Sequence, residues 1–139
     1  MPYPAEYQRA SDHFAEFLND TKIESQLNSV HQAYTVAQGV FQVFRRRISP
    51  RDSIIFMSAL NASLRSLYTA DWDPDEPRVP FGSMEIMNRE VRLLRPDHNF
   101  ATDTAIQDVG RALRKHVDAK TLANMLEKLP AKARDFWRE

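Results

Sequence analysis

The chain has 139 residues, 42% of them hydrophobic and 27% charged, and its 19 basic and 19 acidic residues cancel. A chain of this length forms one domain that buries roughly two-thirds of its unfolded surface. The balanced charge excludes a whole-molecule field that would draw the protein to nucleic acid or an anionic membrane. The absence of cysteine excludes disulfides and thiolate chemistry. With no signal-like N-terminus and no apolar stretch of the ~18 residues that a membrane span needs, we expect a soluble, cytoplasmic protein.

The first half predicts three helices, over residues 6–19, 30–47 and 50–69, from apolar residues at helical spacing. Ser29 is placed to cap the second, which is apolar around most of its girth and is expected at the centre. Ser49 and Pro50 suit the start of the third. Because position 61 is Asn rather than proline, we expect that helix to run through it unbroken. The four tyrosines lie on apolar stripes and are expected in the core with a hydroxyl at its edge: Tyr3, Tyr7, Tyr34 and Tyr68.

The segment after the third helix predicts an extended connector over residues 71–82. Its run from Asp71 to Pro80 holds three prolines and four acids, which preclude a helix. Trp72 is expected to plug a gap between the two halves of the chain, because an indole in a polar connector favours burial. The alternative is an exposed anchor for a partner, since tryptophan is enriched in interface hot spots.

The second half predicts three further helices. The first begins after Ser83 and ends before Pro96, the second covers residues 102–116, and the third is capped by Asp118. We expect Pro130 to break this last helix, because its ring clashes with the carbonyl four residues earlier.

An ungapped repeat with an offset of 69 residues relates the two halves. It places apolar residues on apolar residues and basic residues on basic residues, for example Leu60 on Leu129 and Arg65 on Arg134. The sequence therefore predicts an all-α fold: two tandem three-helix repeats packed as one helical domain over residues 1–139. Repeat one covers about residues 6–70, the connector residues 71–82 and repeat two about residues 83–138.

The order of these motifs resembles a bacterial family known as domain of unknown function 2267. The likeness rests on a basic helix end, a Ser-Pro-capped helix that ends in Leu64-Arg65-Ser66-Leu67-Tyr68, then Trp72-Asp73-Pro74, and a second copy with Leu129-Pro130 and a terminal Phe136-Trp137. It extends from about Phe14 to Trp137. The resemblance implies a duplicated all-helical fold in the bacterial cytoplasm, and it carries no catalytic residues over to this chain. Asn61 departs from the pattern, where a Leu-Pro step is expected.

Two basic clusters mark the ends of the central helices of the two repeats. Cations there offset the helix dipole by roughly 0.3–1 kcal/mol each, which is a sufficient reason for them. The alternative is a patch for an anion, a phosphate backbone or a partner. We look for a specific surface first on the exposed face of 107–115. The candidate patch consists of Arg45, Arg46, Arg47, Arg111, Arg114 and Lys115.

Motifs for catalysis or for a cofactor are missing from the sequence. Asp71, Asp73 and Asp75 show the spacing of a calcium loop, but Glu76 and Gly82 stand where the loop needs glycine and a bidentate carboxylate. The four histidines have no metal-ligand spacing. We therefore expect no catalytic residue, metal or cofactor, and we interpret the chain as a non-enzymatic interaction or adaptor protein, with a homodimer as one form. The alternatives are a nucleic-acid or anion binder that uses the basic helix ends, and an enzyme with an unrecognised site.

Overall fold

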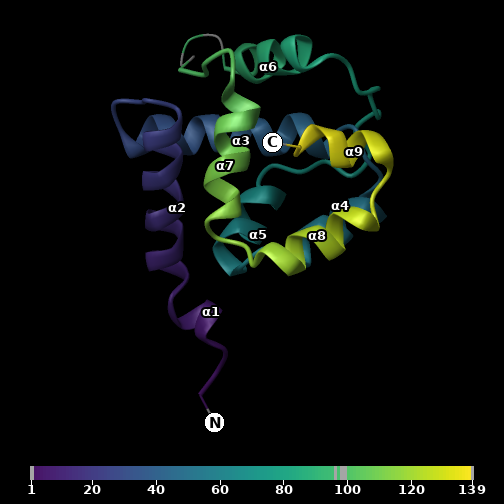
Figure 1. Cartoon of the computed structure of the whole chain (residues 1–139). Helices are drawn as coiled ribbons and strands as arrows, with labels where there is room; N and C mark the ends of the chain where they lie inside the picture. Colours follow the sequence, from purple (N-terminus) through teal and green to yellow (C-terminus); the bar gives the residue numbers. More distant parts are fainter. Residues whose placement is uncertain (1, 96, 98–99, 139) are drawn as a thin grey trace.

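The computed structural model describes residues 2–95, 97 and 100–138. Within these residues the secondary structure is helical and no strand occurs, so the predicted all-α class is confirmed. The helices are α1 (Ala5–Gln8), α2 (Ala10–Glu24), α3 (Val30–Arg45), α4 (Pro50–Met57), α5 (Ala62–Thr69), α6 (Met84–Leu93), α7 (Ala105–Arg114), α8 (Ala119–Glu127) and α9 (Ala131–Phe136) (Figure 1).

The N-terminal helix differs from the prediction for residues 6–19. The backbone leaves helical geometry at Arg9 (φ −106°, ψ 16°), which divides it into a four-residue α1 and an α2 that continues to Glu24. The α1 segment projects away from the body of the protein (Figure 1). Tyr3 is 65% exposed and Tyr7 55% exposed, so the expectation that these two tyrosines lie in the core is wrong. Tyr68, in contrast, is fully buried.

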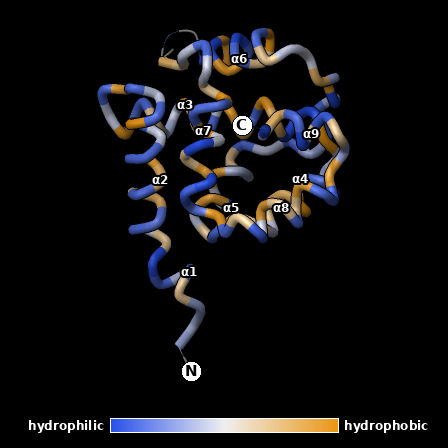
Figure 2. Tube along the Cα trace, in the orientation of Figure 1, coloured by the Kyte–Doolittle hydropathy of each residue, from blue (hydrophilic) through white to orange (hydrophobic). Residues whose placement is uncertain are grey.

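The α3 helix forms the centre of the fold, as predicted. Ser29 caps it by accepting a hydrogen bond from the backbone N–H of Gln32 at 3.2 Å. The helix packs against α2, α5, α6 and α7, which explains why it is apolar around most of its girth. Figure 2 shows that the hydrophobic residues of the other helices alternate with hydrophilic ones, as expected of helices with one buried face.

The prediction of one unbroken helix over residues 50–69 is wrong. The chain forms α4, a turn, and then α5, whose first turn Asn61 caps by accepting from the Leu64 N–H at 3.1 Å. Arg65 donates to the Leu60 carbonyl oxygen at 2.5 Å. In an unbroken helix this oxygen would accept a hydrogen bond from a backbone N–H of the next turn. Asparagine is among the best N-cap residues, so Asn61 starts a helix here without proline.

The last helical segment breaks at Pro130, as predicted. Pro130 stands at the N-cap of α9, and Arg134 donates to the Leu129 carbonyl at 2.7 Å. Arg134 and Leu129 lie 69 residues beyond Arg65 and Leu60, so the same hydrogen bond closes the break in each half.

Both halves of the chain contribute to one aromatic core. The rings of Phe44 and Phe56 lie 4.8 Å apart, Phe44 and Phe136 5.0 Å apart, and the Trp137 indole stacks on Phe56 at 5.3 Å. The helices also cross between halves, because α2 packs on α7 and α6 packs on α3. No helix in the described part of the chain is long and apolar enough to cross a membrane.

Candidate functional site

The end of α3 places the Arg45 side chain inside the protein. The residue is 5% exposed, and its guanidinium donates to the carbonyl oxygens of Tyr68 (2.6 Å), Ala70 (3.0 Å) and Asp71 (3.3 Å). These carbonyls belong to the C-terminal end of α5 and the residues just after it, where helical carbonyls lack internal partners and the dipole is negative. Burial lowers the pKa of Arg45. Arg45 therefore acts as an internal cap for α5.

Arg46 and Arg47 hold the connector against α3 and α6. Arg46 pairs with Glu90 at 2.9 Å and with Glu76 at 3.3 Å, and Arg47 pairs with Glu90 at 2.6 Å. Arg47 also donates to the Pro80 carbonyl at 3.1 Å. These two arginines, at the C-terminal end of α3, bind carboxylates and a carbonyl of the connector and of α6.

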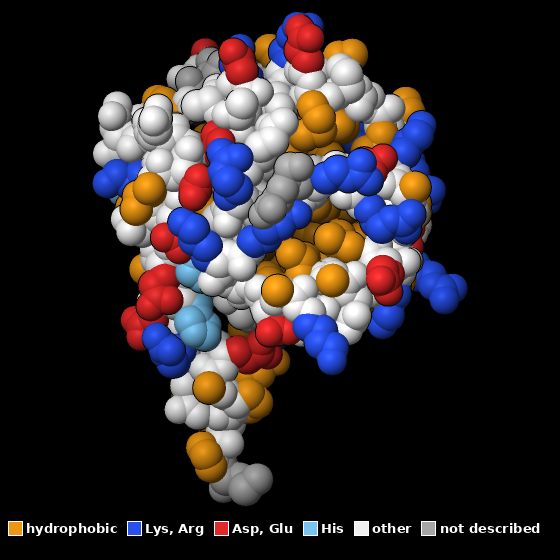
Figure 3. Space-filling model, viewed as in Figure 1, with side chains coloured by type: hydrophobic (Ala, Val, Ile, Leu, Met, Phe, Trp, Pro, Cys, Tyr) orange, Lys and Arg blue, Asp and Glu red, His pale blue; other side chains and the backbone are white. Residues whose placement is uncertain are grey.

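The basic end of α7 contacts α2 and α9. Glu24 binds Arg111 at 2.9 Å and Lys115 at 3.2 Å, and these hydrogen bonds hold the pKa of the Glu24 carboxyl below its usual range. Arg114 donates to the Trp137 carbonyl at the end of α9. Arg114 and Trp137 lie 69 residues beyond Arg45 and Tyr68, so this hydrogen bond also occurs in both halves. Figure 3 shows acidic side chains interleaved with basic ones over α2 and α7.

The two basic helix ends line different cavities. Arg45 and Arg46 line one of about 190 Å³ beside Trp72, whereas Arg111 and Arg114 line one of about 250 Å³ between α7 and α9. Every residue of the candidate patch binds a carbonyl or carboxylate of its own chain. The six cations thus serve intramolecular bonds and are divided between two sites.

Trp72 packs on the first half of the molecule. Its ring meets Tyr68 edge-on with 6.2 Å between centroids, and the Arg45 guanidinium lies 5.7 Å from its centroid, within cation–π range. The side chain is half-buried. These contacts join the start of the connector to α3 and α5, both in the first half, and leave part of the indole accessible.

Among the residues that the structure describes, no group of three or more Asp, Glu or His side chains is placed to hold a metal ion. Asp73 instead accepts from the Asp75 N–H at 2.9 Å, which closes a local turn. His116 lies 2.6 Å from an Asp20 oxygen, and its ring packs edge-on against Phe17. This pair ties the end of α7 to α2.

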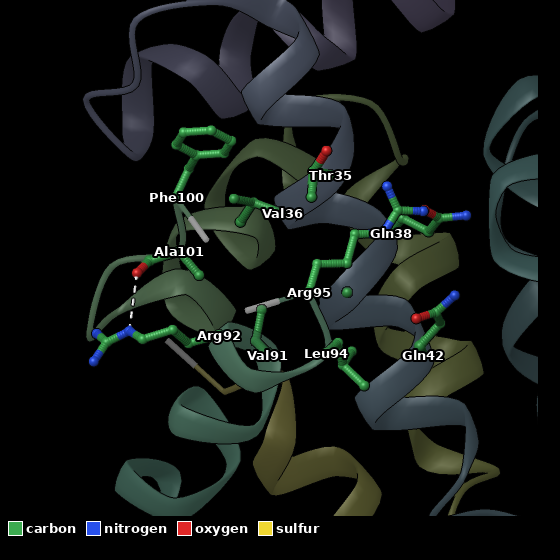
Figure 4. A pocket seen from close by; sticks show the side chains of 11 residues that line it. Thr35, Val36, Gln38, Gln42, Val91, Arg92, Leu94, Arg95, Phe100 and Ala101 are labelled. Carbon is green, nitrogen blue, oxygen red and sulfur yellow. Dashed lines mark hydrogen bonds between the residues drawn. The ribbon is translucent and has the colours of Figure 1, made fainter. Parts of the chain in front are cut away.

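A small cavity of about 20 Å³ lies between α3 and α6 (Figure 4). Gln38 on α3 is buried there and accepts a hydrogen bond from Arg95 at 3.1 Å. Gly39 allows the close approach of α6, because a Cβ at this position would lie 3.2 Å from Val91 Cγ1. A space of this size holds about one water molecule, so it is a packing feature and not a ligand site.

A wider, open groove lies between α2, α3 and α5, and we call it the α2–α5 groove. Its volume is about 470 Å³. Phe14 and Tyr34 form an aromatic wall, edge-on with 6.3 Å between centroids. The remaining lining is mainly small: Ala10, Ser11, Ala62, Ser63, Ser66, Leu67 and Ala70.

Sequence reasoning missed this groove. Ala62, Ser66 and Ala70 recur every four residues and therefore lie along one face at α5. That spacing of small residues is the signal that could have revealed it, whereas the larger apolar residues of the segment indicate only its buried face. Small side chains leave room above a helix, and neighbouring α2 and α3 supply the aromatic wall.

The fold and its surfaces define a class of all-helical protein with an aromatic core and an open apolar groove. The sequence model of the family described as "Uncharacterized conserved protein (DUF2267)" matches residues 14–136. The chain belongs to this family, as its motifs predicted. A comparison with curated proteins found no match.

Proposed function

We propose that this chain is a non-enzymatic helical interaction protein, an adaptor, and that the α2–α5 groove is its contact surface. The observation that carries the proposal is the groove itself, an open apolar hollow of about 470 Å³ beside two aromatic side chains. Concave, mainly apolar hollows of about 300–1,000 Å³ with a few polar groups are the usual places where ligand groups bind. An aromatic wall next to a floor of small residues suits insertion of a partner's side chain, which is how interface anchors bind.

The chemistry of the groove supports binding over catalysis. All nine lining residues are described, and they offer methyl groups, aromatic rings and the hydroxyls of Ser11, Tyr34, Ser63 and Ser66. A general acid–base pair requires groups that titrate near neutral pH, such as a carboxylate or an imidazole. The lining supplies neither, so packing and hydrogen bonding are the interactions that it favours.

The ion pairs at the basic helix ends favour a protein partner over a nucleic acid. Binding a phosphate backbone draws on cations that are free to neutralise phosphates. Arg46 and Arg47 are already paired with Glu90, and Arg111 and Lys115 with Glu24. A phosphate would have to displace these carboxylates, and the Arg45 carbonyl contacts lie in the interior.

Two further parts of the proposal concern organisation and location. We infer that the chain is a tandem duplication of a three-helix repeat, with the third helix of each repeat divided in two. The supporting observations are the equivalent hydrogen bonds of Arg45 and Arg114, and of Arg65 and Arg134. The family resemblance and the absence of cysteine support the bacterial cytoplasm as its location.

A site-specific photocrosslinker tests the proposed function. Benzoylphenylalanine at the exposed Thr69 places the reactive group on α5 beside the lining residues Ser66 and Ala70 and leaves the groove open, and the same residue at the exposed Ala123 on α8 is the matched control. Irradiation in cells of the native host should give a protein adduct from position 69 and none from position 123. Failure of position 69 to crosslink, or purified protein that turns over a substrate in a hydrolase and transferase screen, would contradict the proposal.

A further inference from the structure

The N-terminal arm, residues 2–8, presents two aromatic side chains to solvent next to the groove. Tyr3 is 65% exposed and Tyr7 55% exposed, and the arm extends beyond the body of the protein in Figures 1 and 3. Tyrosine is enriched at protein interfaces, because its ring supplies apolar area and its hydroxyl a hydrogen bond. An ordered arm that carries two of them is suited to bind a hollow surface.

Several interactions fix the arm in this projecting position. Arg65 on α5 binds Glu6 at 2.8 Å, and the Gln8 side chain donates to the Tyr3 carbonyl. Pro4 has the polyproline geometry of a stiff, extended chain (φ −53°, ψ 144°). An arm that is already ordered loses less conformational entropy when it binds.

From these features we infer that the arm of one copy occupies the α2–α5 groove of a second copy, which forms a twofold dimer. This inference rests on the function proposed above and names the partner as the same chain. The small Ala62, Ser63 and Ser66 leave room for a ring, and Phe14 and Tyr34 offer it an aromatic wall.

The position of the groove makes a symmetric exchange possible. The groove begins at Ala10 and Ser11, immediately after the arm ends at Gln8. A twofold axis near the first turn of α2 therefore carries each arm over the groove of the other copy, in one self-complementary patch. The formal net charge of zero means that two copies meet without overall repulsion.

The area that the tyrosines can bury indicates a weak dimer. Tyr3 and Tyr7 are already partly buried, so each contributes less than the roughly 150–250 Å² of a fully buried aromatic, and the four tyrosines of a dimer together contribute less than about 1,000 Å², in the range of weak, transient interfaces. We therefore expect a reversible dimer with a dissociation constant on the order of 10 μM.

Sedimentation equilibrium of the full chain over about 1–500 μM tests the dimer, since this range spans the expected constant. Wild type should pass from monomer to dimer. The Y3S/Y7S double variant, changed only in the arm, and S66W, which fills the groove from an exposed position, should each weaken self-association at least about 30-fold, as expected when hot-spot contacts are lost. The I54S/I86S control removes two exposed apolar residues elsewhere and should dimerise like wild type.

A mixing experiment separates arm exchange from any other dimer. Y3S/Y7S keeps an intact groove and S66W keeps an intact arm, so a mixture can form one complete arm–groove contact. Because the chain has no cysteine, a single Cys at position 123 accepts a fluorophore in each variant. Energy transfer should appear in the mixture at concentrations where neither variant self-associates.

A wild type that stays monomeric, or a dimer that both variants leave unchanged, would overturn the inference. The crosslinker at Thr69, beside the open groove, distinguishes this failure from that of the proposed function. An adduct of two copies supports arm exchange, an adduct with a different protein refutes it while the proposed function stands, and no adduct refutes both.

Discussion

The guanidinium of Arg45 donates a hydrogen bond to the Tyr68 carbonyl at 2.6 Å, inside the protein and across 23 residues of sequence. Arg45 ends α3 and Tyr68 lies in the last turn of α5, so the bond joins the C-terminal ends of two helices. A buried cation is stable here because three carbonyl oxygens replace its hydration. In the second half, Arg114 makes the equivalent bond to Trp137.

Replacing Arg45 with methionine should destabilise the protein by about 2–4 kcal/mol, because buried carbonyls would lose a charged donor. R45K should fall between wild type and R45M, since an ammonium lacks the planar fork of donors. Urea unfolding monitored by circular dichroism measures the difference. R51M, at an exposed position on α4, is the control and should stay within ~0.5 kcal/mol of wild type. An R45M variant as stable as R51M would refute the capping role.

Replacing Asn61 with alanine should lower the free energy of unfolding by about 1 kcal/mol, because the Leu64 N–H loses its N-cap. N61D retains an acceptor and should keep most of the stability. N124A makes the same change inside α8, where alanine is the better helix former, and should be neutral or slightly stabilising. Thermal unfolding of the three variants checks this, and equal effects of N61A and N124A would contradict the break at Asn61.

Acid should weaken the contact between α2 and α7. The pKa of Glu24 is lower in the folded protein because Arg111 and Lys115 bind its carboxylate. A lowered pKa stabilises the fold above the unfolded value, about 4.3, and this contribution disappears as the pH falls through the folded pKa. E24Q should therefore reduce stability at pH 7 by less than about 1 kcal/mol, as for other exposed pairs, and flatten the fall between about pH 5 and pH 3. Urea midpoints against pH measure this, with E127Q as the control; parallel curves for E24Q and wild type would exclude the pairing.

Replacing Gly39 with alanine should destabilise the protein by about 1 kcal/mol. The new methyl group would meet Val91 Cγ1 at 3.2 Å, and overpacking a helix contact outweighs the gain in helix propensity. The V91A background should remove the penalty, so a double-mutant cycle should give a coupling of at least ~0.5 kcal/mol. G82A, whose Cβ would find its nearest neighbour at 3.7 Å, should be neutral. Additive effects of G39A and V91A would show that the two residues do not meet.

Local chemistry in the sequence predicts four of the helix starts. Each of the predicted caps accepts a backbone hydrogen bond in the structure: Ser29, Ser49, Ser83 and Asp118. The helix predicted over residues 102–116 begins later, at Ala105, and no side-chain hydrogen bond caps it. Pro130 alone is enough to predict the break, because proline inside a helix lacks the backbone N–H donor and clashes with the preceding turn. Asn61 does not, because asparagine occurs within helices as well as at their caps.

The surfaces depended on contacts between distant segments. The sequence places cations at the end of a helix, where they offset its dipole, but it does not show which groups bind them. The carboxylates that bind Arg46 and Arg47 belong to Glu76 and Glu90, which lie far along the chain. The apolar spacing of residues 6–19 predicts that Tyr7 faces the core. The bend at Arg9 turns α1 away from the core, and Tyr7 is therefore exposed. The α2–α5 groove likewise requires three helices from different parts of the chain.

The crossing of α2 onto α7 and of α6 onto α3 has a consequence for how the chain holds together. The helices of each half have an apolar face that the helices of the other half cover, and the contact between Phe44 and Phe136 joins the two halves. If the chain were cut in the connector and the two fragments were separated, each fragment would expose core residues and should aggregate. Mixed together, the two fragments should bind one another and regain their structure.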